Sequence, residues 1–278
     1  MIHELINLDV DYKHYGIDHS DKKATLELFV LDNMEGVTKE KERPFILICP
    51  GGGYQHLSPR EAEPIAIKFN SYGFNAGILR YSINPDIFPS QLLETDMAMS
   101  IIRSRSEEFK LAKGKLIIAG FSAGAHVAAS AGTLYNTELV KNLGIDPMNL
   151  RPDAMMLAYP VITSGEHAHR GSFINLLGSN YDKYLDFVSL EKHIDSNTPA
   201  TFIWHTFEDQ AVPLENSLYF ANELRKNNVK FEYHVFPNGS HGLALATEET
   251  VTSDGKCYQP ECSCWTELFK EFVKNLSC

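Results

Sequence analysis

The segment from Lys115 to Ala131 constrains the fold of this chain more than any other. It begins with an apolar run, Leu116 to Ala119, whose length and continuity are typical of a parallel strand covered on both faces. Small residues and good helix formers follow from Ala123 to Ala131, which predicts a buried helix. Between the two lies Gly-Phe-Ser-Ala-Gly, so Ser122 occupies the corner of an abrupt strand-to-helix turn.

The Gly-x-Ser-x-Gly pattern indicates a nucleophile, because its glycines allow a turn tight enough to expose the serine hydroxyl at the top of a sheet. A serine hydroxyl reacts only with a neutral imidazole beside it and a carboxylate that orients the imidazole. After such a turn the acid precedes the histidine in the chain, each at the end of a later strand. Asp209 follows the apolar run Pro199 to His205, and His241 follows Lys230 to Phe236. We therefore predict the catalytic residues Ser122, Asp209 and His241.

Other residues compete for these roles. Glu208 could be the acid, although Asp-x-x-Val-Pro after the penultimate strand favours Asp209 by analogy. His205 lies inside an apolar strand, and His126 lies one helical turn beyond the serine, so both are expected to pack in the interior. Surface or loop positions are expected for the remaining candidates downstream, His167, His169 and His193.

The run Gly51-Gly52-Gly53 ends another apolar segment and could be no more than a flexible turn. It is not a phosphate-binding loop, since no Gly-Lys-Ser/Thr follows. In a serine hydrolase, glycines at this loop let backbone N–H groups approach the oxyanion of the tetrahedral intermediate. We predict an oxyanion hole formed by Gly52, Gly53 and Ala123, the residue after the nucleophile. His56 is close enough to this run to line a pocket, and a solvated loop position is an equal alternative.

The rest of the chain alternates strand and helix patterns, which predicts an α/β fold with a mostly parallel sheet and helices on both faces. Two β-rich runs near the start predict antiparallel edge strands at Leu5 to Val10 and Ala24 to Leu31. Further strands are predicted at Pro44 to Cys49, Phe74 to Leu79 and Asp153 to Tyr159. A helix is predicted from Ser58, with Glu61 at its N3 position, to Tyr72, and Pro64 could kink this helix or delay its start. Further helices are predicted at Gln91 to Phe109, Glu215 to Lys226 and Pro260 to Asn275. The irregular segment from Thr163 to Asn197 is expected to pass over the carboxyl edge of the sheet and to shape the pocket.

Composition limits the class of protein. A chain of 278 residues with 44% hydrophobic and 22% charged residues suits one domain spanning residues 1–278. With 25 basic and 36 acidic residues the net charge is −11, which argues against nucleic-acid and anionic membrane partners. The start of the chain lacks an export-signal pattern, so a cytoplasmic protein is expected.

The five cysteines are expected to be free thiols, because their number is odd and no export signal is present. Cys257, Cys262 and Cys264 cluster, but their spacing lacks the paired Cys-x-x-Cys pattern of a zinc site. Neither a metal nor an organic cofactor is expected, because an oxyanion hole supplies the electrophilic stabilisation that a metal would otherwise give.

These motifs together resemble the α/β-hydrolase superfamily, and within it the bacterial acetyl esterase and xylan esterase-like branch related to hormone-sensitive lipase. The resemblance covers about Leu26 to Ala246. It is carried by Pro-Gly-Gly-Gly-Tyr from Pro50, Arg-Tyr-Ser from Arg80, Gly-Phe-Ser-Ala-Gly-Ala-His, His-Thr-Phe-Glu-Asp from His205, and Gly-Ser-His-Gly around His241.

The resemblance implies the α/β-hydrolase fold and an ester substrate, a small molecule of the acetylated-sugar class. Related esterases often carry histidine where this chain has Pro50, which leaves the oxyanion donors open among Gly52, Gly53 and Tyr54. A peptidase or lactone hydrolase with the same three residues, and a non-catalytic ligand-binding member of the fold, are the alternatives. The sequence does not fix the oligomeric state and leaves a homodimer open.

Overall fold

A single mixed sheet organises the computed structural model, which describes residues 1–20, 22–33 and 41–276. The eight strands of this described part lie in the order β1-β2-β4-β3-β5-β6-β7-β8. From β3 onward the neighbouring strands are parallel, whereas β1 pairs antiparallel with β2 and β2 antiparallel with β4. The strand bounds are β1 Ile2–Asn7, β2 Thr25–Val30, β3 Arg43–Cys49, β4 Asn75–Arg80, β5 Leu111–Phe121, β6 Ala154–Ala158, β7 Ala200–Thr206 and β8 Phe231–Phe236.

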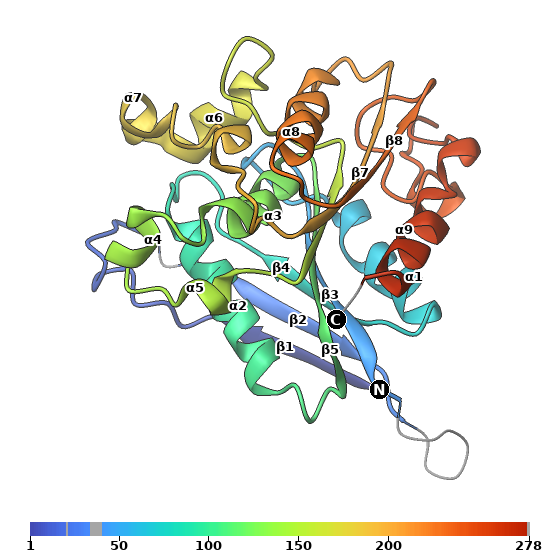
Figure 1. The fold of residues 1–278 in the computed structure, drawn as a ribbon, viewed down its shortest axis with the longest axis horizontal. Helices are drawn as coiled ribbons and strands as arrows, with labels where there is room; N and C mark the ends of the chain where they lie inside the picture. The colour runs from blue at the N-terminus through green and yellow to red at the C-terminus, as the bar shows by residue number, and fades with distance from the viewer. Residues whose placement is uncertain (21, 34–40, 277–278) are drawn as a thin grey trace.

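Helices cover both faces of this sheet (Figure 1). The face covered by α1 and α9 holds a core rich in aromatic rings, and the opposite face packs against α2, α3 and α8. The helices within the described residues are α1 Glu63–Ser71, α2 Ser90–Ser104, α3 Ala123–Leu134, α4 Glu138–Asn142, α5 Pro147–Leu150, α6 Arg170–Leu177, α7 Tyr181–Tyr184, α8 Glu215–Lys226 and α9 Trp265–Lys274. The predicted α/β-hydrolase fold, with its antiparallel N-terminal strands, is confirmed.

Apolar runs located the central strands well, because strands buried on both faces must be apolar throughout. In β3 and β5 the residues from Phe45 and from Leu116 onward are fully buried. The predictions for the two N-terminal strands are less accurate. β1 ends at Asn7, before the predicted Val10, and β2 pairs on both sides, so of these two only β1 is an edge strand. The alternating burial of β1 gives a sequence pattern that a loop can also carry.

Two predicted helices are divided in the structure. The segment after Ser58 forms a 3-10 turn, Pro59–Glu61, before α1, and the Ser58 side chain makes no capping hydrogen bond. Pro64 accounts for the break, since proline is tolerated in the first helical turn and not within a helix. The last helix is likewise a 3-10 turn, Pro260–Cys262, followed by α9.

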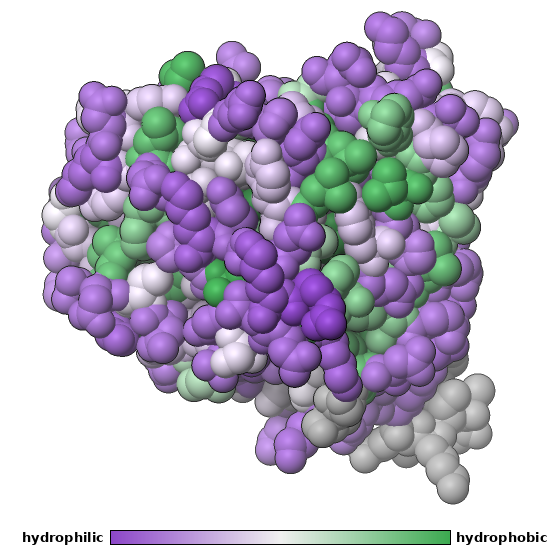
Figure 2. Space-filling model, turned by 45° about the horizontal axis from the view of Figure 1, so that its top comes forward, coloured by the Kyte–Doolittle hydropathy of each residue, from purple (hydrophilic) through white to green (hydrophobic). Residues whose placement is uncertain are grey.

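The carboxyl ends of β5, β6, β7 and β8 meet at one edge of the sheet, where the chain also passes through α6 and α7. Figure 1 places these two short helices beyond α3, at the top of the view. The face that carries them is largely hydrophilic, with hydrophobic side chains gathered in separate patches (Figure 2). No helix in the described ranges is long and apolar enough to cross a bilayer.

Candidate active site

The turn between β5 and α3 presents Ser122 in a strained backbone conformation. Its φ of 54° and ψ of −119° lie in a region that residues with a side chain rarely occupy. Glycine is required on both sides because the chain folds back on itself: a Cβ on Gly120 would overlap the backbone of Gly124, and a Cβ on Gly124 would overlap the carbonyl oxygens of Cys49 and Pro50. The turn therefore holds the Ser122 hydroxyl at the start of α3, where 8% of the residue is exposed.

Three side chains from three strand ends meet at this hydroxyl. Ser122 Oγ donates to Nε2 of His241 over 2.8 Å, and Nδ1 of His241 donates to Oδ2 of Asp209 over 2.6 Å. The Asp209 side chain is fully buried, whereas 22% of the His241 side chain is exposed. The structure thus brings together the three residues that the sequence predicts, in the geometry that general-base activation of a serine requires.

The carboxylate of Asp209 is surrounded by donors. The backbone N–H groups of Ala211 and Val212 both donate to Oδ1 over 2.9 Å, and Nε2 of His205 donates to Oδ2 over 3.1 Å, beside His241. Burial opposes ionisation, but the hydrogen bonds from the two histidines outweigh it and hold the pKa of Asp209 below its ordinary value. Asp209 is therefore an anion whose position is fixed by four donors.

Glu208, the alternative acid, is exposed and its Oε2 accepts the N–H of Gly239 over 3.1 Å. It thereby ties the loop after β8 to the loop after β7, without a hydrogen bond to His241. His205 is fully buried, as expected for a core histidine, yet its contact with Asp209 Oδ2 also places it next to the candidate catalytic residues. The apolar strand pattern predicted its burial and gave no signal of this contact.

Backbone N–H groups in the cavity wall and at the start of α3 are candidate oxyanion donors. Within the described residues, the N–H groups of Gly52 and Gly53 have no protein acceptor. That of Ala123 is the first of α3, so it has no acceptor within the helix, and the helix dipole adds partial positive charge there. The predicted oxyanion hole of Gly52, Gly53 and Ala123 therefore stays a prediction, supported by the lack of a competing acceptor for these N–H groups.

The carbonyl sides of the same peptides are held from outside. Gly51 O accepts the backbone N–H of Ser58 over 2.9 Å, and Gly52 O accepts that of Gln55 over 3.0 Å. The next carbonyl oxygen, Gly53 O, accepts from Nδ2 of Asn175 over 2.8 Å. Positive φ values of 126° and 63° at Gly52 and Gly53 explain why glycine is needed for this path. A loop fixed through its carbonyl groups is preorganised, and it need not rearrange when negative charge develops at the site.

The backbone N–H of Tyr54, the third residue considered as an oxyanion donor, also has no protein acceptor in the described chain, although its side chain does not line the cavity that holds Ser122. Tyr54 is buried, and its hydroxyl donates to Nδ1 of His126 over 2.8 Å. Nε2 of His126 donates in turn to the carbonyl oxygen of Val188 over 2.9 Å. Burial lowers the pKa of His126 to about 4, so this histidine is neutral and packs in the interior, as expected.

The cavity above Ser122 has a volume of about 370 Å³, which suits a small ligand. Apart from glycine its walls are polar or charged side chains, with no aliphatic residue among them. They are Gly52, Gly53, Gln55, His56, Ser58, Arg60, Glu61, Ser122, His169, Gly171, Asn175, His241 and Gly242. His56 therefore takes the pocket position, one of its two expected locations.

His169 is a wall residue that the sequence analysis assigned to a surface or loop position. It directly precedes α6, its Nδ1 is hydrogen-bonded to Ser172 Oγ over 2.8 Å, and it is half-buried. Burial first, and then the nearby His241, lower its pKa, so His169 offers a neutral imidazole to the cavity. The sequence analysis expected the segment from Thr163 to Asn197 to shape the pocket. Nothing in the sequence of this segment distinguished His169 as a wall residue.

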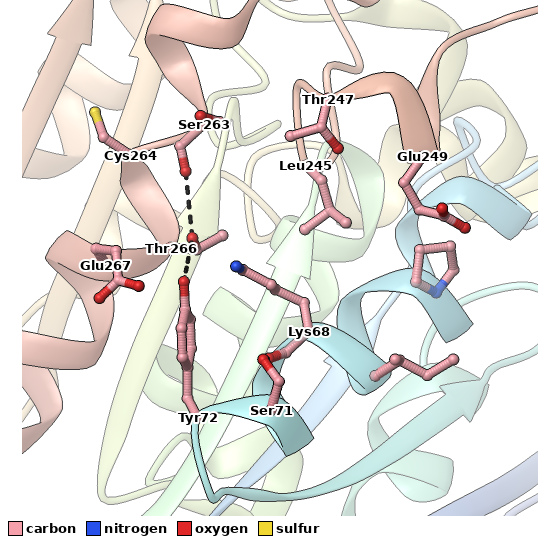
Figure 3. A pocket seen from close by; sticks show the side chains of 12 residues that line it. Lys68, Ser71, Tyr72, Leu245, Thr247, Glu249, Ser263, Cys264, Thr266 and Glu267 are labelled. Carbon is pink, nitrogen blue, oxygen red and sulfur yellow. Dashed lines mark hydrogen bonds between the residues drawn. The ribbon is translucent and has the colours of Figure 1, made fainter.

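A second hollow, larger at about 580 Å³, lies between α1 and α9 (Figure 3). We call it the α1–α9 groove; it is lined by Pro64, Ile67, Lys68, Ser71, Tyr72, Leu245, Thr247, Glu249, Ser263, Cys264, Thr266 and Glu267. Its two serines, Ser71 and Ser263, donate to backbone carbonyl oxygens and have no histidine partner. In the part of the chain that is described, no three His, Cys, Asp or Glu side chains are placed to hold a metal ion.

The cysteines near the site are free thiols. Cys257 Sγ lies 3.6 Å from the carbonyl oxygen of His241, and Cys262 Sγ lies 3.6 Å from that of Asn238, so both pack under the loop that carries the histidine. Cys264 is exposed, and Cys278 lies outside the described residues.

Known proteins are similar to this chain in sequence and in fold. The model of the BD-FAE family matches residues 31–224, which include Ser122 and Asp209. An endo-1,4-beta-xylanase B from Butyrivibrio fibrisolvens is 39% identical over 213 residues, which are 75% of this chain and 34% of that protein. An acetylxylan esterase from Xylanibacter ruminicola is 25% identical over 234 residues, 82% of this chain and 45% of that protein. This chain thus spans less than half the length of either relative.

Solved structures agree over nearly the whole chain. An acetyl ester-xyloside bifunctional hydrolase from Caldicellulosiruptor lactoaceticus superposes with a TM-score of 0.81 at 34% identity, covering 98% of this chain and 95% of that one. The carboxylesterase Cest-2923 from Lactobacillus plantarum gives a TM-score of 0.83 at 25% identity, covering 99% and 97%. The resemblance to bacterial acetyl and xylan esterases is confirmed by these matches.

Proposed function

The chain belongs to the BD-FAE family, and from this premise we propose that it is a serine carboxylic ester hydrolase that removes acetyl groups from sugars or short oligosaccharides. One observation carries the proposal: the hydrogen-bonded series Ser122, His241, Asp209 opens onto a cavity that also presents backbone N–H groups. A nucleophile, its base and donors for an oxyanion are the three parts that acyl transfer needs.

In the acylation half of the reaction, Ser122 Oγ attacks the carbonyl carbon of the ester while Nε2 of His241 takes the serine proton. The carbonyl oxygen becomes an oxyanion, which accepts hydrogen bonds from the N–H groups of Gly52, Gly53 and Ala123. Collapse of this intermediate breaks the bond to the sugar oxygen, which leaves as an alcohol with the proton from His241. Asp209 stays ionised and stabilises the imidazolium that forms in between.

In the deacylation half, water takes the place of the alcohol. His241 removes one proton from the water, whose oxygen attacks the acyl carbon, and the same N–H groups bind the second oxyanion. Breakage of the acyl–Oγ bond returns the proton to Ser122 and releases acetic acid. Each donor that is lost from such a site costs about 3 kcal/mol of barrier stabilisation, which is why the fixed glycine loop matters.

The substrate class rests on the walls of the cavity and on the relatives. Imidazole, amide and guanidinium groups suit a ligand rich in hydroxyls, and a hollow of about 370 Å³ is at the small end of ligand pockets. The names of two relatives, an acetylxylan esterase and an acetyl ester-xyloside hydrolase, support acetyl groups on xylose-containing sugars.

A substrate panel tests this proposal. We expect kcat/KM for acetylated xylo-oligosaccharides and for an acetyl aryl ester to exceed that for aryl esters of eight or more carbons by at least tenfold, because the cavity is small and polar. The Ser122→Ala variant provides the background rate. A preference for long acyl chains, or for a chromogenic dipeptide, would refute the sugar-acetate substrate and leave the serine mechanism standing.

A further inference from the structure

Glu61 is a buried carboxylate in the wall of the candidate active site, and the acyl-transfer steps above do not use it. Only 3% of the residue is exposed, and it ends the 3-10 turn before α1. Its Oε2 accepts the backbone N–H of Gly51 over 2.9 Å, and its Oε1 accepts the hydroxyl of Tyr159 over 2.7 Å. A buried carboxylate is costly unless its oxygens are hydrogen-bonded, so these two contacts fix where Glu61 can lie.

The first contact holds the peptide that leads into the glycine loop. The Pro50–Gly51 peptide is bound on both edges, since its N–H donates to Glu61 and its carbonyl oxygen accepts the hydroxyl of Tyr81 over 2.6 Å. Packing leaves little freedom: a Cβ on Gly51 would lie 2.7 Å from Glu61 Oε2 and 2.9 Å from Ser122 Cβ. The orientation of this peptide sets the direction of the N–H groups that follow.

The second contact reaches the loop that carries the base. Tyr159 follows β6 with a φ of 36°, and its buried hydroxyl also accepts the N–H of Ala244 over 3.0 Å. Its ring meets the His241 imidazole edge to face, with centroids 5.0 Å apart. Ala244 is held on its other side as well, because its carbonyl oxygen accepts Nε1 of Trp265 over 3.0 Å. Tyr159 therefore supports His241 both by ring contact and through the backbone three residues later.

We propose that Glu61 and Tyr159 are positioning residues, which lock the oxyanion loop and the His241 loop to each other through the series Gly51 N–H, Glu61, Tyr159 O–H and Ala244 N–H. The inference rests on the proposed function, since it assigns these residues a role in aligning its two halves. A displacement of about 1 Å between reacting groups can lower the rate about a hundredfold. Such a lock therefore affects the reaction rate independently of its effect on the stability of the fold.

Glu61→Gln tests the lock with little change in volume. The amide can accept from only one of the two donors with its oxygen, and its NH2 group then faces the other. We expect kcat to fall by tenfold or more with KM within about threefold, because groups that act mainly in the transition state are displaced while the other residues of the cavity wall remain.

Glu94→Gln is the matched control. Glu94 is fully buried in α2, its Oε1 accepts the hydroxyl of Tyr12 over 2.7 Å and its Oε2 accepts the N–H of Ser82 over 2.7 Å. It repeats the contacts of Glu61 with a tyrosine and a backbone N–H, but it does not line the cavity. Both variants should lose thermal stability, and only Glu61→Gln should lose kcat beyond threefold.

Tyr159→Phe and the double variant complete the test. Tyr159→Phe should also lower kcat, and the double variant should lose about as much as the worse single variant, because both changes break one series of contacts.

The positioning role would be overturned by an equal effect of Glu61→Gln and Glu94→Gln on kcat at matched stability, or by effects of Glu61→Gln and Tyr159→Phe on kcat that simply multiply. If Ser122→Ala retained activity, the proposed function itself would fail. Wild-type turnover that requires Ser122, with kcat unchanged in Glu61→Gln, would overturn only the present inference.

Discussion

The candidate active site and the α1–α9 groove are two hollows of the same molecule with opposite characters. The groove is larger, about 580 Å³ against 370 Å³, and is lined by one face of two helices and a loop. Two of its polar groups contact the Tyr72 side chain: the Tyr72 hydroxyl is hydrogen-bonded to Thr266 Oγ1 over 3.0 Å, and the Lys68 ammonium lies 4.6 Å from the centre of the Tyr72 ring (Figure 3). The smaller cavity instead holds a serine hydroxyl hydrogen-bonded to a histidine, which is hydrogen-bonded in turn to a buried carboxylate.

This difference shows that the larger hollow of this fold is not the one where the candidate catalytic side chains meet. Reactive groups converge where the carboxyl ends of parallel strands meet, because each strand end contributes one side chain to the same place. Ser122, Asp209 and His241 come from the ends of β5, β7 and β8, while the groove lies on the flank of the sheet, where helices only cover it. Strain at Ser122 and its hydrogen bond to His241 favour the smaller cavity as the candidate active site.

The largest effect should follow from loss of the buried anion in the small cavity. Asp209→Asn keeps the shape of the side chain but presents an amide to His241, which favours the wrong imidazole tautomer. We expect kcat to fall by about 10⁴-fold. Glu208→Gln is the control at the neighbouring position and should change kcat by less than threefold. Steady-state kinetics on an acetyl aryl ester measures both, and the reverse ranking would make Glu208 the acid.

The smallest effect should come from the groove. Tyr72→Phe removes the hydrogen bond to Thr266, which should lower the free energy of unfolding by about 0.5–1.5 kcal/mol and change kcat/KM by less than twofold. Denaturant unfolding and steady-state kinetics on the same preparations provide the two values. A tenfold loss of kcat/KM at unchanged stability would show that the groove takes part in turnover.

The same comparison explains how far the sequence could be interpreted. Central strands and the elbow at Ser122 were predictable, because burial on both faces and a strained turn each require a distinctive local sequence. The order of Asp209 and His241 after later strands then predicted the residues that the structure brings together. Segment ends were predicted less well, since an edge strand such as β1 and a helix delayed by Pro64 carry weaker local signals.

Contacts between distant segments were not predictable. Glu61 looked like the N3 position of an ordinary helix start, and its link to Tyr159 joins residues 98 positions apart. His169 carried no local signal either, because only the tertiary path of α6 brings it beside the cavity. The sequence therefore predicted the three side chains that meet at Ser122, but not the residues that surround them.

The attachment point of a covalent inhibitor tests the central claim most directly. Incubation with p-nitrophenyl diethyl phosphate, followed by peptide mass spectrometry, should place one diethylphosphoryl group on Ser122, with loss of esterase activity in parallel. The same reagent should leave Ser122→Ala unlabelled and should react with His241→Ala far more slowly, since the serine then lacks its base. Full inactivation with the label on another residue, or with Ser122 unmodified, would contradict the claim that Ser122 is the nucleophile.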